Sequence, residues 1–458
     1  MAGKTEQAIP IYAAIAGALP DNPANWVNLA IVEFKAKRFS DVIEHAGTAL
    51  RLQPDSPAAN LFMGASYAAL GDHRRAIEPL EKAIRAQPGD RNARLMLADE
   101  WLALEHYDES AAQFRKASAL SPENPRAWYG LGRSYEGLSE NVLHRLETTA
   151  PDSPFYLSLA ASIFLKQQRY GSAFANYKRA LAGAPGMNGI HSGLATVYER
   201  TGHPDWATVE RERERALSPG ECTAHATACD FLTGRYQVVI DAGGDTPEQL
   251  YWTSKAYAEL AQDAYRHLAQ LPPSREFHVH AARSLDLSGE YRQAVDEWTE
   301  ALKIAPDDLE AQTSLVWSLY RSGGSERALP VLIDLLKAKP NSSELNFLYG
   351  ASLLSLEQPE KALPALETAA RLDPQFLPAQ AALGQALLLM GRALDAIPHL
   401  KAALAADEDT STRFQLLRAY QLTGQMELTR QALADYQQAR ALAERTKRLE
   451  EAGEITAP

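Results

Sequence analysis

The chain has 458 residues, of which 46% are apolar, 8% aromatic and 23% charged, an ordinary globular composition whose length alone would suggest about three domains. It carries 46 Lys and Arg against 58 Asp and Glu, a formal charge of −12 with no polybasic run, which argues against nucleic acid or an anionic membrane as the main partner. No stretch approaches the ~18 apolar residues that a membrane span requires.

The first residues have the pattern of half a helical hairpin. Gly3 and Lys4 match a turn, and Ala8, Tyr12 and Ile15 have the spacing of the helix that follows such a turn. The helix that should precede the turn is missing. Because helical arrays protect their ends, we expect either a truncated chain or a cap supplied by residues upstream.

Prolines then recur at a constant 34-residue spacing. Between two of them, residues 60–69 have helical apolar spacing, Gly71 and Asp72 break it, and residues 75–86 form a second helical stretch. This period predicts a repeated unit of helix, turn, helix and turn, stacked on its neighbours around one continuous core. The spacing holds within three groups of prolines: Pro54, Pro88 and Pro122; Pro185 and Pro219; and Pro306, Pro340 and Pro374.

A second set of prolines follows Ala-Ile or Ala-Leu at the start of the second helix of a unit. We expect them in the first turn of that helix, where a missing N–H group costs little. They are Pro10, Pro330, Pro364 and Pro398.

The 34-residue register breaks twice. Five residues are lost between Pro122 and Pro185, within residues 139–154, which predicts a short second helix there. Fifteen are lost between Pro219 and Pro306, within residues 221–274. The second break is interpreted equally well as a bend between two sub-arrays or as harmless drift. We expect a first sub-array over 1–219, irregular units over 220–274, a second sub-array over 275–436, and a polar helical extension and tail over 437–458.

Residues 275–306 carry the clearest repeat, with the matching residues Ala281, Ala282, Leu285, Gly289, Tyr291, Ala294, Trp298, Ala301 and Pro306. This pattern resembles the tetratricopeptide repeat family, of a bacterial type, and the resemblance covers almost the whole chain. It implies an all-α fold, a right-handed superhelix of stacked helix-turn-helix units. The last residues, 425–452, are expected to form one long polar capping helix, followed by a frayed tail.

Two cysteines, Cys222 and Cys229, flank His225 in an arrangement with three interpretations. A disulfide between the cysteines would imply an exported protein. A metal site would need a fourth ligand, such as His278 or His280, from a neighbouring unit. Two buried thiols acting as small apolar residues are the third interpretation. The compartment is therefore cytoplasmic or, if the disulfide forms, exported or periplasmic.

The sequence offers no motif that indicates catalysis. It has no P-loop, no GxGxxG after a strand, no GxSxG and no HExxH, so we expect no enzyme activity, no catalytic residue, no cofactor and no bound metal. The run Glu210 to Arg215 alternates in charge and is expected to be a solvated helix face with local ion pairs.

The family resemblance implies that the first helix of each unit lines a concave groove. Trp, Tyr and Arg are typical of binding hot spots, so we expect a partner site there, although Trp317 fits a contact with the next unit equally well. The candidate residues are Tyr129, Arg133, Arg283, Trp317, Tyr320, Arg321 and Phe347.

The expected function is a non-catalytic scaffold that holds a peptide or protein surface in this groove. The alternative is the recruiting or regulatory portion of a larger enzyme or secretion assembly. Neither hypothesis predicts an oligomeric state.

Overall fold

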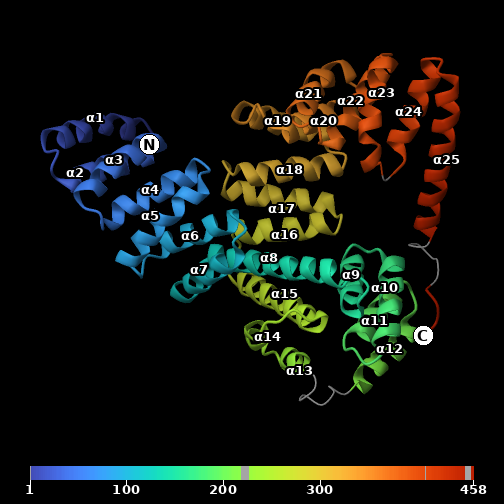
Figure 1. Ribbon diagram of the computed structural model, residues 1–458. Helices are drawn as coiled ribbons and strands as arrows, with labels where there is room; N and C mark the ends of the chain where they lie inside the picture. The colour runs from blue at the N-terminus through green and yellow to red at the C-terminus, as the bar shows by residue number, and fades with distance from the viewer. Residues whose placement is uncertain (1, 218–225, 408, 449–454) are drawn as a thin grey trace. The chain divides into compact units, whose positions relative to one another are not determined.

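The structure is a computed structural model that describes residues 2–217, 226–407, 409–448 and 455–458 (Figure 1). Over these residues it contains 25 α-helices and one short 3-10 turn, and it has no strand there. The prediction of an all-α fold is confirmed. The chain divides into two compact units, of which one comprises Met1–Pro151 and Pro219–Glu276 and the other comprises Asp152–Ser218 and Phe277–Pro458.

In the first unit, successive helices pack side by side as pairs joined by short turns. Its helices are α1 (Ala2–Ala18), α2 (Pro23–Lys35), α3 (Phe39–Leu52), α4 (Pro57–Ala69), α5 (His73–Ala86), α6 (Arg91–Ala103), α7 (Tyr107–Leu120), α8 (Pro125–Thr149), α13 (Ala226–Leu232), α14 (Tyr236–Ala242) and α15 (Pro247–Gln270).

The second unit begins with two helix pairs, resumes at α16 and ends in a long helix. Its helices are α9 (Pro154–Lys166), α10 (Tyr170–Gly183), α11 (Ile190–Arg200), α12 (Pro204–Ala216), α16 (Arg275–Leu287), α17 (Tyr291–Ile304), α18 (Leu309–Arg321), α19 (Ser325–Ala338), α20 (Ser343–Ser355), α21 (Pro359–Leu372), α22 (Leu377–Leu389), α23 (Ala393–Ala403), α24 (Ser411–Leu422) and α25 (Met426–Arg448).

Short sequence signals define where the helices of a unit begin and turn. At the start of α4, the Ser56 side chain accepts a hydrogen bond from the Ala59 N–H and Pro57 takes the first helical position, as capping preferences predict. The turn after α4 needs a left-handed backbone, which Gly71 supplies at φ 76°. In repeats that lack this glycine, residues such as Lys37 and Glu357 adopt φ 61° and 57°. The residues that recur every 34 positions therefore lie at the ends of helices in the structure.

The structure corrects the prediction for the first residues. Gly3 and Lys4 lie in the first turn of helix α1, not in a turn between helices. A helix start tolerates both residues, because its N–H groups have no intrahelical acceptor.

The second set of prolines also lies elsewhere than predicted. None is in a first turn: Pro10 lies in the interior of α1, and Pro330, Pro364 and Pro398 lie in the second turn of their helices, inside the helical ladder. All four prolines are exposed, so the carbonyl that each leaves unpaired can bond to water.

The first register break has a different cause from the one predicted. Residues 139–149 do not form a short second helix, because they continue α8 without interruption to Thr149. Within the second break, α14 has only 7 residues, whereas α15 runs as one helix from Pro247 to Gln270. Helices α8 and α15, with 25 and 24 residues, are thus both about twice as long as the usual helix of a repeat, and they pack against each other (Figure 1).

A glycine lies where the two helices of a repeat cross, and its contacts show that α8 and α15 stand in the place of an ordinary helical hairpin. A Cβ on Gly64 would lie 2.7 Å from the side chain of Leu80 on the next helix, and Gly350 and Gly384 meet Leu366 and Leu400 in the same way. The next glycine in the same position, Gly132, instead meets the ring of Tyr265, which lies on the distant helix α15 and 2.4 Å from the Cβ position. The first half of α8 is therefore the first helix of a repeat, and the C-terminal half of α15 is the second helix of that repeat.

The remaining contacts between these two helices follow an antiparallel order. Trp128 stacks on His267 at 4.4 Å, while further along α8 the Ser139 hydroxyl donates to the Ser254 carbonyl at 2.9 Å. Arg145 forms an ion pair with Asp245 beyond that point. One repeat is thus split by an insertion of more than a hundred residues, whose middle part, Asp152–Ser218, belongs to the second unit.

The two compact units group the chain differently from the predicted sub-arrays, whose boundaries stay a prediction. Residues 152–218 group with the C-terminal part of the chain and 219–276 group with the N-terminal part. The predicted limits assumed that neighbours in sequence stack in order, whereas α8 leaves the order at the split repeat. A bend of the array near residues 220–274 stays a prediction.

The C-terminal part combines the predicted helix with an unpredicted contact. Helix α25 extends over Met426–Arg448 and is largely exposed, as expected for a polar cap. Residues 455–458 were expected to fray, but the Tyr198 hydroxyl donates a 2.7 Å hydrogen bond to the carbonyl of Thr456.

We predict that Gly132→Ala destabilises the first unit by about 1–3 kcal/mol, because its methyl group overpacks the Tyr265 ring. Helix propensity alone would favour alanine by about 1 kcal/mol. Gly17→Ala is the matched control, since Gly17 lies in α1 with no atom within 4 Å of its Cβ position. Urea denaturation measures both, and a Gly132→Ala chain as stable as the Gly17→Ala chain would contradict the split repeat.

Candidate functional site

The first predicted residues, Tyr129 and Arg133, lie together on α8 in the first unit. The Arg133 guanidinium donates to the Tyr129 hydroxyl at 3.3 Å and is 3.5 Å from the Glu136 carboxylate. The ring of Tyr265, which the sequence prediction missed, lies 6.5 Å from that of Tyr129. Burial raises the pKa of the Tyr265 hydroxyl, so it stays neutral. Both predicted side chains are half-buried and belong to the contact between α8 and α15.

Three other predicted residues form an aromatic cluster in the second unit, which we define as Trp317, Tyr320, Phe347 and Phe376. The Trp317 ring lies 6.2 Å from Tyr320 and 5.9 Å from Phe347, and Phe376, missed by the prediction, lies 5.2 Å from Phe347. Phe347 is buried, while Trp317 and Tyr320 are half-buried. Burial raises the pKa of Tyr320 above its ordinary value.

The cluster joins consecutive repeats and also leaves aromatic surface accessible. Trp317 on α18 contacts Phe347 on α20, and its indole N–H donates to the Glu344 carboxylate. The alternative expectation, that Trp317 contacts the next repeat, is thus confirmed. Its half-exposed ring still offers apolar area on α18, the helix that also carries the exposed Arg321.

The other two predicted arginines, Arg283 and Arg321, have different surroundings. The Arg321 guanidinium lies over the Tyr291 ring at 5.0 Å and donates to its hydroxyl at 2.8 Å. These two residues line an open depression of about 410 Å³ at the turn before α17. Arg283 is half-buried on α16 and lies near His280, whose pKa is lowered by burial and by the Arg283 charge. Of the three predicted arginines, Arg321 is therefore the exposed one.

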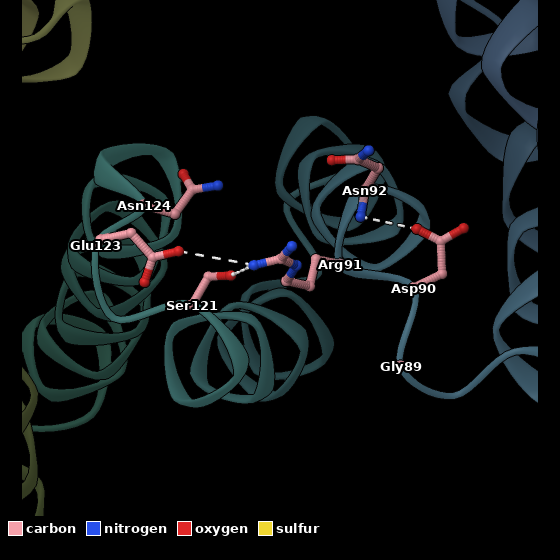
Figure 2. Close-up of a pocket in the computed structure, with 7 residues that line it drawn as sticks. All are labelled: Gly89, Asp90, Arg91, Asn92, Ser121, Glu123 and Asn124. Atoms are coloured by element: carbon pink, nitrogen blue, oxygen red, sulfur yellow. Dashed lines mark hydrogen bonds and ion pairs between the residues drawn. The ribbon is translucent and has the colours of Figure 1, made fainter.

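A second depression, of about 440 Å³, lies at the turns that precede α6 and α8 in the first unit. Figure 2 shows Arg91 reaching across it to donate to the Ser121 hydroxyl at 2.6 Å and to pair with Glu123 at 3.6 Å. Asp90 accepts from the Asn92 N–H and so caps α6. These polar groups are already engaged with one another, so the depression is explained by turn geometry.

Polar side chains 19 positions apart join the two helices of several repeats. The most buried pair is His191 with Glu210, which also accepts from Arg213 at 2.7 Å. Such buried pairs satisfy groups that would otherwise be costly inside a helical hairpin. The others are Arg94 with Gln113 at 2.9 Å, His278 with Glu297 at 2.8 Å, and Gln380 with His399 at 2.7 Å.

The charged run Glu210 to Arg215 is only partly the solvated face that was expected. Glu210 is 1% exposed. Glu214 accepts from the N–H groups of Gly189 and Ser192 at 2.7 and 3.0 Å, which caps the start of α11. Helix α11 has no side-chain cap of its own, so α12 supplies one. Glu210 and Glu214 are therefore structural, while the other four residues of the run are exposed.

The cysteine hypotheses remain open. Cys229 is buried in α13, whereas Cys222 and His225 lie outside the described residues. Among the residues that the structure does describe, no group of three or more His, Cys, Asp and Glu side chains is placed to hold a metal ion. Over the same residues, no helix is both long and apolar enough to cross a membrane. The disulfide between Cys222 and Cys229 stays a prediction.

Helix pairs that cross at a glycine, with caps and prolines between pairs, define a helical-repeat protein. Models of the tetratricopeptide repeat match residues 57–100, 95–142 and 248–405, more than half of the chain in all. The chain belongs to the tetratricopeptide repeat family.

Two curated proteins are similar to parts of the chain. It is 26% identical over 191 residues to anaphase-promoting complex subunit 3 of Schizosaccharomyces pombe, which covers 41% of this chain and 28% of that protein. It is 32% identical over 88 residues to the cell division cycle protein 27 homolog of Caenorhabditis elegans, covering 19% and 11%. The chain thus spans less than a third of either relative. Both are eukaryotic, so they do not support the bacterial type.

Solved structures with similar folds include yeast Tom70, at 15% identity and a TM-score of 0.33, over 93% of this chain and 95% of that one. A tetratricopeptide repeat protein of Thermus thermophilus is 21% identical with a TM-score of 0.32, over 38% of this chain and 99% of that one. These likenesses concern the fold alone.

We predict that acid destabilises the second unit partly through His399. Burial lowers the pKa of His399, and its Nδ1–H donates to Gln380. The unfolded chain therefore takes up the proton first, so stability is full above the unfolded pKa of about 6.5 and falls as the pH drops through the folded value. Calorimetric melting at about pH 7 and about pH 5 should show a weaker pH dependence for His399→Gln.

The complementary variant is Gln380→Glu, which recreates the His and Glu pair found at His191 and Glu210. A carboxylate beside His399 favours the protonated imidazole, so this chain should lose less stability in acid than the parent. Equal pH dependence for the parent and both variants would contradict the assignment.

Proposed function

We propose that the chain is a non-catalytic scaffold that binds a peptide or protein surface along the first helices of its repeats. Tetratricopeptide repeats generally mediate protein–protein interaction, and this chain belongs to that family. The observation that carries the proposal is the aromatic cluster together with Arg321 at the end of the same helix, α18. Trp317 and Tyr320 offer half-exposed rings on α18, and Arg321 at its end is exposed. Aromatic and Arg side chains are typical of the residues that dominate binding energies.

The charge of the site suggests the chemistry of the partner. Arg321 offers a guanidinium beside rings, an arrangement that suits a carboxylate next to an apolar side chain. The whole chain carries a net charge of −12, which would repel an acidic segment elsewhere, so this local positive group would determine where such a segment binds.

A second candidate function is that of the recruiting or regulatory portion of a larger assembly. It is favoured by the name of the Schizosaccharomyces pombe relative, a subunit of a complex, and by the greater length of that relative. Cross-linking and mass spectrometry of the native complex distinguish the two: partners with enzyme activity at fixed stoichiometry support this candidate, and exchangeable partners support the first.

We predict that Arg321→Glu reduces capture of the partner from a lysate of the native host by about fivefold or more. The reversed charge both removes the guanidinium and repels an acidic segment. Arg371→Glu is the matched control. Arg371 is also an exposed arginine of the second compact unit, but it lies on α21, which is the second helix of its repeat.

Quantitative mass spectrometry of the captured proteins compares the two variants with the parent chain. Loss of the same protein from Arg321→Glu alone is the expected result. Equal capture by both variants would contradict a site at α18.

A further inference from the structure

Residues 455–458, with the sequence Ile-Thr-Ala-Pro, lie against helix α11. The Tyr198 hydroxyl donates a hydrogen bond to the Thr456 carbonyl oxygen at 2.7 Å, although the two residues are 258 positions apart. Ile455 and Pro458, on either side of this contact, are half-buried. Both partners belong to the second unit. The segment is thus seated on a repeat that is far away in sequence.

Tyr198 is held rigidly by its neighbours. Its ring lies 5.8 Å from Phe174 on α10 and 5.6 Å from Trp206 on α12, in an edge-to-face arrangement with Trp206. Trp206 in turn stacks on His203 at 4.1 Å. Three helices therefore fix the direction of the hydroxyl group. Burial raises the pKa of Tyr198 to about 12, with a further contribution from Glu210, so the hydroxyl remains a donor at neutral pH.

We propose that the face of α11 around Tyr198 is a peptide-docking site for an extended, uncharged segment, and that residues 455–458 of the chain itself occupy it. A hydrogen bond to a backbone carbonyl recognises the main chain of the ligand, so it does not require one particular side chain. The side chains of the four docked residues carry no charge and include a proline, which favours an extended backbone. This site is separate from the aromatic cluster and does not rest on the proposed function.

Occupation by the chain's own segment makes that segment an internal competitor. A tethered ligand acts at an effective concentration in the mM range. A partner peptide of the same chemistry must then displace residues 455–458 before it can bind. The docked segment therefore raises the concentration of partner peptide that is needed for binding at α11.

The test adds the segment back to a shortened chain. A fluorescently labelled peptide with the sequence of residues 449–458 is titrated into the intact chain and into a chain that ends at Arg448, and anisotropy measures binding. We expect the peptide to bind the shortened chain and to bind the intact chain at least about tenfold more weakly. Equal binding to both chains, or no binding to the shortened chain at about 1 mM, would overturn the proposal.

Tyr198→Phe in the shortened chain identifies the contact. It removes one hydrogen bond and should weaken peptide binding by about five- to tenfold. Tyr170→Phe, on the neighbouring α10, is the matched control and should leave the affinity unchanged. Equal affinities for the two variants would overturn the assignment to Tyr198.

Hydrogen exchange provides a second measurement, which compares the intact chain with a chain that lacks residues 455–458 and does not require the Tyr198→Phe variant to fold. Deletion of residues 455–458 should increase amide exchange within Ile190–Arg200 several-fold, because the segment no longer covers this helix. Unchanged exchange in α11 would refute docking on this face.

Discussion

The approach of the α8 backbone to the Tyr265 ring is the contact on which the arrangement of the first unit depends. At Gly132 a Cβ atom would lie 2.4 Å from that ring, so only a glycine lets the two helices cross this closely. In other repeats the same position receives a leucine from the second helix of the same hairpin, as Gly64 does from Leu80. Here the partner comes from α15, and one repeat closes around an insertion of more than a hundred residues.

This single departure accounts for several features at once. Both α8 and α15 are long, because each contributes one half to the split repeat and continues beyond it, where Ser139 meets Ser254. Residues 152–218 leave the first unit and carry the surface that holds residues 455–458. The candidate interaction surfaces of the second unit, at α11 and α18, are thus built on ordinary repeats. The irregular helices α8 and α15 belong to the first unit, where they close the split repeat.

Most of the fold could be predicted from the sequence, because local signals determine helix ends. The 34-residue proline spacing, the Gly71 turn and the Ser56 cap act within a few residues of one another. The split repeat joins Gly132 to Tyr265, a partner so distant in sequence that no local pattern specifies it. One signal was present. In the repeats of Gly64, Gly350 and Gly384 a leucine follows the glycine by 16 positions, whereas Thr148 stands 16 positions after Gly132.

The candidate sites were predictable to a smaller extent for the same reason. Trp317 and Tyr320 on α18 and Phe347 on α20 lie on the first helices of consecutive repeats, and they do come together. Tyr265 and Tyr198 could not be selected, since each matters through a contact distant in sequence. Buried charge was also missed: Glu210 and Arg211 are neighbours in an alternating run, yet only the first faces inward.

The split repeat is tested most directly by a cysteine cross-link between its two helices. Ser139→Cys and Ser254→Cys replace hydroxyl oxygens that lie 3.1 Å apart, within reach of a disulfide, in a chain whose Cys222 and Cys229 are changed to Ser. Mild oxidation should join this pair almost completely, as measured by intact mass and peptide mapping. A pair that places the second cysteine at Gln262, two turns further along α15, should stay reduced. No cross-link between positions 139 and 254, or equal cross-linking of both pairs, would contradict the split repeat.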